Sequence, residues 1–90
     1  MTESNPHQEK RYGFVGIVVE TRHRRGKQVQ EVLSRFADLI QGRMGLPHLE
    51  DDRISVITLI VHADADEVGA LTGRLGSIEG VTVKSGMAKL

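Results

Sequence analysis

The sequence predicts an α+β fold of the ferredoxin-like type, with a four-stranded antiparallel sheet and two helices on one of its faces. Segments with strand and helix patterns follow one another in the order βαββαβ. Two predicted strands are apolar on both faces, whereas the other two carry markers of a sheet edge. A length of 90 residues, of which 39% are hydrophobic, suits a single domain.

The first strand is predicted at residues 12–20, YGFVGIVVE, a segment rich in β-branched residues with charged residues on both sides. Both of its faces are apolar, because side chains alternate between the faces of a strand. Apolar residues then recur at three- and four-residue spacing, which indicates one face of a helix. These are Val29, Val32, Leu33, Phe36, Leu39 and Ile40. The pattern predicts a helix that ends near Gly42.

Residues 43–49 are predicted to form a short edge strand, since Pro47 cannot donate a ladder hydrogen bond. A turn follows at residues 50–52. Residues 53–63 then form the strongest strand pattern in the chain, again with two apolar faces.

The second helix is predicted to start at a capping box formed by Asp64 and Glu67, in which Asp replaces the usual Ser or Thr. It carries apolar residues at helical spacing and ends at Gly76. Residues 79–87 alternate as in a strand with one wet face, and Lys84 suits a sheet edge.

This arrangement of apolar and edge strands predicts the spatial order 4-1-3-2, with the first and third strands central and both helices on one face. The other face is then left bare. Its apolar patch would consist of Phe14, Val18, Ile54, Val56 and Ile60, or of the residues that alternate with them. Burying roughly 500 Å² per subunit would contribute on the order of 12 kcal/mol before association costs. We therefore expect a homo-oligomer, dimer or tetramer, that forms through the open sheet face.

Composition excludes several classes of protein. The chain has no cysteine, so it has no disulfide, zinc finger or iron–sulfur cluster. Twelve Lys+Arg balance twelve Asp+Glu, which argues against a nucleic-acid partner. No apolar run approaches the roughly 20 residues of a membrane span, so no membrane partner is expected. We expect residues 1–10 to be a disordered tail, residues 11–90 to form the domain, and the protein to be cytoplasmic.

The candidate ligand-binding residues lie in the loop between the first strand and the first helix. They are Thr21, Arg22, Arg24, Arg25 and Gly26. Backbone amides and cationic side chains converge at such a helix N-terminus, which favours a small anionic ligand such as a carboxylate or phosphate. The alternative interpretation is a solvated loop without a ligand.

Other chemistry has little support in the sequence. The four histidines, His7, His23, His48 and His62, share no ligand spacing, although His48 or His62 could join a carboxylate in a metal site between subunits. Carboxylates near Asp64 are better explained by helix capping than by a cation. There is no P-loop, G-x-G-x-x-G motif or activated nucleophile. We therefore expect no catalytic residues, no metal, no cofactor and no enzyme activity.

Four segments of the chain have a familiar pattern. They are Arg11-Tyr12 leading into IVVE, the segment RMGLP at residues 43–47, ALTGRLG at residues 70–76 and IEGVTV at residues 78–83. Together they resemble the ACT-like family of iron-only hydrogenase system regulators. The resemblance covers nearly the whole chain after Lys10 and implies an oligomeric ferredoxin-like regulator. It does not extend to amino-acid binding, because the acidic residue and Pro-Gly pair common in such ACT domains are replaced here by Arg24-Arg25-Gly26. The nickel site and the DNA-binding segment of related repressors also have no counterpart.

The sequence therefore predicts a small oligomeric ACT-like regulatory module that senses a small ligand or binds a protein partner. A dimeric ferredoxin-like enzyme and a purely structural assembly module are the alternatives.

Overall fold

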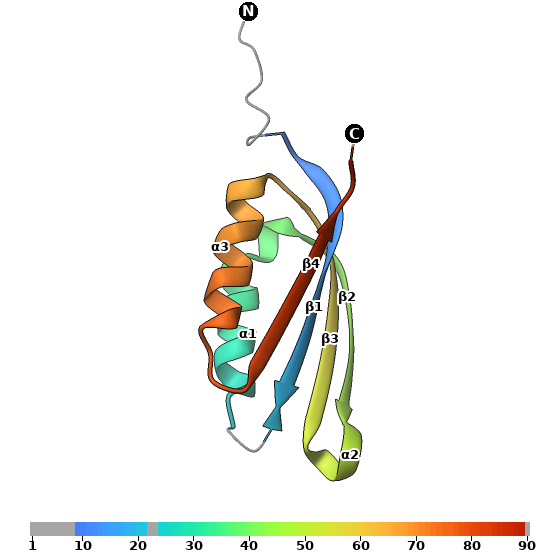
Figure 1. Cartoon of the computed structure of the whole chain (residues 1–90), viewed down its shortest axis with the longest axis vertical. Coiled ribbons are helices and arrows are strands. Elements are labelled where there is room, and N and C mark those ends of the chain that lie inside the picture. Colours follow the sequence, from blue (N-terminus) through green and yellow to red (C-terminus); the bar gives the residue numbers. More distant parts are fainter. Residues whose placement is uncertain (1–8, 22–23, 90) are drawn as a thin grey trace, which may run out of the picture.

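The computed structural model describes residues 9–21 and 24–89, which form a sheet covered by helices on one side (Figure 1). The strands are β1 (Arg11–Glu20), β2 (Ile40–His48), β3 (Ile54–Ala63) and β4 (Val81–Met87). The helices are α1 (Gly26–Arg35) and α3 (Ala65–Gly76), with a single 3-10 turn, η3 (Ala37–Leu39), and a short turn, α2 (Leu49–Asp52). All neighbouring strands are antiparallel in the order β2-β3-β1-β4, so the predicted fold class and strand order are confirmed.

The core lies between the helices and one face of the central strands. Val15 and Ile17 of β1 and Leu59 and Val61 of β3 are completely buried there. Val29, Leu33, Leu71 and Leu75 cover them from α1 and α3. The period-2 and period-3.6 apolar patterns thus meet in one continuous cluster.

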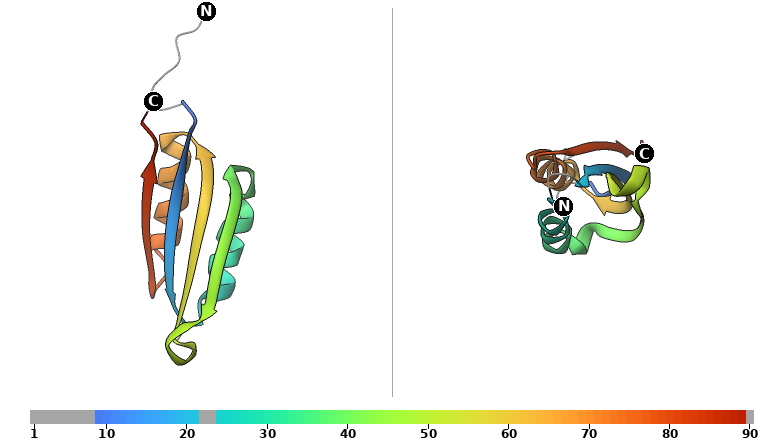
Figure 2. Two further views of the ribbon diagram at one scale, coloured as in Figure 1. Left: turned by 90° about the vertical axis from the view of Figure 1, so that its right-hand side faces the viewer. Right: turned by 90° about the horizontal axis from the view of Figure 1, so that it is seen from below.

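The opposite face of the sheet is uncovered in this chain. The left view of Figure 2 shows all four strands lying in front of the two helices. The described residues include six large apolar side chains that are exposed, and the strand register places all of them on this open face. They are Tyr12, Phe14, Val18, Met44, Leu46 and Ile60. Ile54 and Val56, also expected in the patch, lie on the same face and are partly buried.

The first helix is shorter than predicted. It ends at Arg35, and the chain passes through η3 into β2, which starts at Ile40. Ile40 has an extended backbone and pairs with Val61 of β3, so its apolar side chain belongs to the sheet and not to the helix. Gly42 lies within β2, next to a register shift, and does not end a helix. The predicted end of the helix is therefore wrong.

β2 also begins at Ile40, three residues before the predicted start at Arg43, because the chain enters the sheet directly after η3; the remaining boundaries lie within two residues of the predicted ones. Asp64 Oδ1 accepts from the Glu67 backbone N–H at 2.8 Å, and Glu67 Oε1 accepts from the Asp64 N–H at 3.0 Å, which confirms the capping box. The predicted turn at residues 50–52 is confirmed as part of α2. The tail predicted at residues 1–10 lies outside the described residues, apart from residues 9 and 10. In the described part of the chain, no helix is long and apolar enough to cross a membrane.

Candidate functional site

The loop after β1 and the turn between β2 and β3 meet at one end of the sheet. Antiparallel pairing brings them together, because Glu20 at the end of β1 is opposite Ile54 at the start of β3. Beyond this pair, the Thr21 N–H donates to the Arg53 carbonyl at 2.8 Å. The Thr21 hydroxyl donates to the Asp52 carbonyl. These bonds fix the β1–α1 loop against the turn.

A pocket of about 370 Å³ opens between these two segments on the helix side of the sheet. Its apolar wall consists of Val19, Val29 and Ile57. Its polar wall consists of Thr21, Arg24, Gly26, Gln30, His48, Asp52 and Ser55. A hollow that combines an apolar wall with convergent polar groups has the character of a small-ligand site, and its volume suits a small molecule.

The N-terminus of α1 borders this pocket at Gly26. The described residues provide no side-chain hydrogen bond that caps α1, and no acidic residue lies in its first turn. In contrast, α3 has a complete capping box and two acidic residues in its first turn. The first N–H groups of a helix have no partner within the helix, and the macrodipole there favours negative charge. An anion in the pocket would supply the negative charge and hydrogen-bond acceptors at α1 that acidic side chains supply at α3.

Charged side chains add to this helix end. Arg24 lines the pocket and has a left-handed backbone, with φ 53°, and its N–H donates to the Thr21 carbonyl at 2.8 Å. Across the pocket mouth, His48 Nδ1 pairs with Asp52 Oδ1. Both of these side chains remain largely exposed, so a ligand can reach them.

The structure brings three of the five sequence-predicted site residues to the pocket, namely Thr21, Arg24 and Gly26. Arg25 does not line it. A terminal nitrogen of Arg25 lies 3.6 Å from Glu79 Oε2, so its side chain is directed toward the segment between α3 and β4. Arg22 lies outside the described residues.

Four polar lining residues were not among the sequence-predicted site residues. They are Gln30, His48, Asp52 and Ser55. His48 and Asp52 lie more than 20 positions along the chain from the predicted loop, and no short motif links them to it. The signal for them is topological, because the predicted strand order places the β2–β3 turn beside the end of β1.

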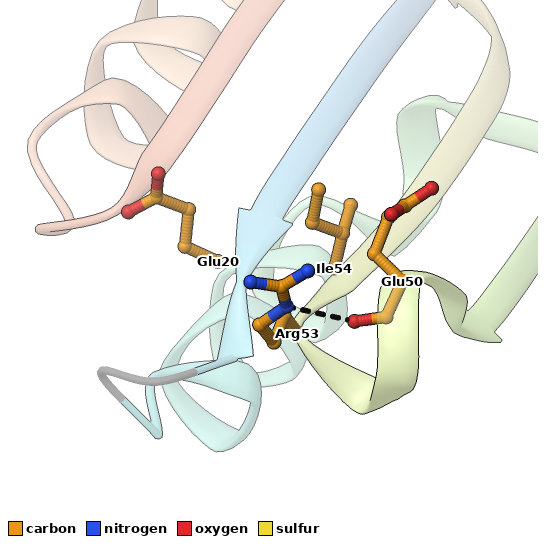
Figure 3. Close-up of a pocket in the computed structure, with 4 residues that line it drawn as sticks. All are labelled: Glu20, Glu50, Arg53 and Ile54. Atoms are coloured by element: carbon orange, nitrogen blue, oxygen red, sulfur yellow. Dashed lines mark hydrogen bonds between the residues drawn. The ribbon is translucent and has the colours of Figure 1, made fainter.

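A second hollow, of about 560 Å³, lies at the same end of the molecule and is lined by Glu20, Glu50, Arg53 and Ile54. Arg53 Nε donates to the Glu50 carbonyl at 2.9 Å. Figure 3 shows the guanidinium between the side chains of Glu20 and Glu50, whose carboxylates both point away from it. Two carboxylates beside one guanidinium make this hollow less suitable for a small anion than the pocket at α1.

The described residues contain no group of three or more histidine, cysteine, aspartate or glutamate side chains that could hold a metal ion. In the candidate site, His48 and Asp52 form a pair of such side chains and not a group of three.

Comparison with known proteins places the chain in a family. Residues 11–85 match the TM1266-like family, whose members are designated iron-only hydrogenase system regulators. The chain belongs to this family. The protein TM1266 from Thermotoga maritima, which is uncharacterized, has the same fold with a TM-score of 0.83 and 41% sequence identity. The match covers 90% of this chain and 100% of TM1266. No curated protein matches the chain.

More distant structures share the fold of this TM1266-like chain. The ACT domain of GTP pyrophosphokinase from Chlorobium tepidum matches with a TM-score of 0.71 and 23% identity, over 84% of this chain and 97% of that domain. A protein described as PII-like and signalling, from Thermus thermophilus, matches with a TM-score of 0.60 and 16% identity, over 89% of each chain. The TM1266-like chain is thus a member of a regulator family with an ACT-like fold.

Proposed function

We propose that this TM1266-like protein is a non-enzymatic regulatory domain that binds a small anion, a carboxylate or a phosphate, in the pocket at the N-terminus of α1. The observation that carries the proposal is the uncapped start of α1 at a pocket that also contains Arg24. Backbone N–H groups of α1 and the Arg24 guanidinium then border one volume of about 370 Å³.

The pocket offers recognition but little chemistry. Its described polar lining provides one cation, one carboxylate paired with a histidine, a glutamine and two hydroxyl groups. A nucleophile needs a base within hydrogen-bond reach, and neither Ser55 nor Thr21 has such a bond to His48 among the described contacts. Thr21 instead donates its hydroxyl to a backbone carbonyl. This supports binding in preference to catalysis.

The test is a thermal-shift and calorimetric titration of the purified protein with inorganic phosphate, sulfate and small dicarboxylates such as malonate. A ligand that binds only the native state raises the melting temperature, by an amount that corresponds to about 2.7 kcal/mol at one hundred times its Kd. At least one of these anions is expected to give a saturable shift at low salt.

The deciding variant is Arg24→Asn. Asparagine tolerates a left-handed backbone, so the substitution removes the guanidinium while it keeps the loop conformation. A lost hydrogen bond to a charged group is worth about 1.5–3 kcal/mol, which predicts roughly 10- to 100-fold weaker binding. Lys27→Gln is the matched control, because it removes a charge three residues away, in the first turn of α1, at a residue that does not line the pocket. Equal weakening by both variants, or no anion binding by the parent protein, would refute the proposal.

A further inference from the structure

The open face of the sheet is the largest feature of the molecule that the proposed ligand site does not use. It carries all six exposed large apolar side chains of the described residues, at exposures from 37% for Val18 to 69% for Met44. Side chains of this size leave roughly 80–100 Å² each in water at such exposures, or about 500 Å² in total. A patch of this size is near the upper end of the roughly 300–600 Å² that the largest apolar patch of a monomer covers, and such patches are often functional.

We propose that a second copy of this chain covers the open face, related by a two-fold axis that runs parallel to the strands between β1 and β3. Two patches of about 500 Å² would bury about 1,000 Å² together, which reaches the lower threshold of about 1,000 Å² for a biological interface before any polar rim is counted. A two-fold interface uses the same patch on both copies, so no second surface is required.

The axis direction follows from the residue pairs on the open face. Rotation about this axis places β1 of one copy over β3 of its partner, and β4 over β2. The register pairs Phe14 with Ile60 and Val18 with Val56 within one chain. In the dimer, Phe14 of one copy therefore faces Ile60 of the other, and Val18 faces Val56. An aromatic ring then packs on an aliphatic side chain. Gly16, opposite Thr58, leaves room at the centre for close approach of the sheets.

Charges at the tip support the same axis. Glu20 pairs with Ile54 in the register, and Arg53 directly precedes Ile54. The rotation therefore brings Glu20 near the partner's Arg53, and Arg53 near the partner's Glu20. Two reciprocal ion pairs would close the hollow of about 560 Å³ that these residues line (Figure 3).

The perpendicular arrangement is less favourable. A two-fold axis across the strands at the level of Gly16 would keep β4 over β4 and bring the exposed Lys84 side chain against the partner's Lys84. It would also place the charged tip over Tyr12 and His62, whose rings stack at 4.3 Å between centroids. The parallel axis instead places the Lys84 stem over the partner's Met44, with the ammonium at the rim.

The experiment measures the oligomeric state by sedimentation velocity between micromolar and millimolar concentrations. The parent protein is expected to be dimeric or a higher assembly built from this dimer. Ile60→Lys adds a charge within the patch, on the central strand β3, and is expected to weaken dimerisation roughly 100-fold. Ser85→Lys is the matched control, since it adds the same charge at an exposed strand position whose register partner, Val15, faces the helices.

Charge reversal tests the axis. Glu20→Arg and Arg53→Glu are each expected to weaken dimerisation about tenfold, because each places like charges together across the interface. The double variant E20R/R53E is expected to recover affinity. A monomeric parent protein at millimolar concentration, or a dimer that tolerates Ile60→Lys, would overturn the proposal. If the double variant dimerised no more tightly than either single variant, the proposed direction of the two-fold axis would be overturned. None of these outcomes depends on anion binding at α1, so the two proposals fail separately.

Discussion

A single isosteric substitution at the start of α1 is expected to change stability and anion binding in opposite directions. Gln28 is exposed and lies in the first turn of α1, which contains no acidic residue. Gln28→Glu adds a negative charge where the helix macrodipole favours one, which is worth about 0.3–1 kcal/mol at low ionic strength. For a domain of this size, the melting temperature should rise by a few degrees.

The same carboxylate should weaken the binding of an anion. At a separation of roughly 7 Å in a water-like dielectric, repulsion between two unit charges is about 0.6 kcal/mol. This corresponds to about threefold weaker binding of inorganic phosphate. Both effects should fade as salt is raised, since exposed charges are screened within about 10 Å at 0.1 M.

The assays are thermal denaturation followed by circular dichroism, and calorimetric titration with phosphate. Gln41→Glu is the matched control, because it makes the same change at an exposed residue of β2, remote from the start of α1. That control should change neither the melting temperature nor the phosphate affinity appreciably. If Gln28→Glu raised the melting temperature but left phosphate affinity unchanged, the anion would not sit at this helix end, and the reasoning would be refuted.

Three further substitutions test the fold that positions the site. Asp64→Ala removes the acceptor of the 2.8 Å bond from the Glu67 N–H and should lower the unfolding free energy by about 1 kcal/mol, seen as a melting point about 4–8 °C lower; an unchanged melting point would contradict the capping role. Gly86→Ala would place a Cβ 2.6 Å from the far end of the Phe14 ring, but this ring is exposed and can rotate aside, so urea denaturation should show a loss below about 1 kcal/mol; a larger loss would mean that the ring is held over the glycine. Leu71→Ala, at a completely buried position, should cost about 2–5 kcal/mol by the same assay; a loss below about 1 kcal/mol would place Leu71 outside the core.

Most of the fold could be predicted because its signals are local. The capping box requires only Asp64 and Glu67, and both are close in sequence. The two central strands are recognisable because both of their faces are apolar, which follows from helices on one side and an open apolar patch on the other. Strand order then follows from the short connections and the edge markers Pro47 and Lys84.

The end of α1 could not be predicted from spacing alone. Leu39 and Ile40 continue the helical period, and no glycine or proline lies between Arg35 and Ile40 to end the helix earlier. The decisive contact is non-local, because Ile40 pairs with Val61, which lies 21 positions further along the chain. Tertiary pairing therefore outweighs a periodic pattern at this point.

The site divides in the same way. Thr21, Arg24 and Gly26 lie in one loop, and the loop's position between a strand and a helix marks it as a candidate anion site. Strand pairing brings His48 and Asp52 to the pocket. The contact with Glu79 directs the Arg25 side chain away from it. A side chain's direction from a loop depends on such partners, and sequence does not encode them locally.

The β2–β3 turn presents side chains to both candidate surfaces, and its backbone is strained accordingly. His48 and Asp52 line the pocket at α1, whereas Glu50 and Arg53 line the hollow at the open face. His48, Glu50, Asp51 and Asp52 all have positive φ, between 51° and 72°. Each left-handed residue other than glycine costs about 1–2 kcal/mol. Glycine would adopt this backbone at lower cost, but it would present no carboxylate or imidazole to either surface. Under the two proposals above, this strained backbone is what presents His48 and Asp52 to the pocket and Glu50 to the hollow.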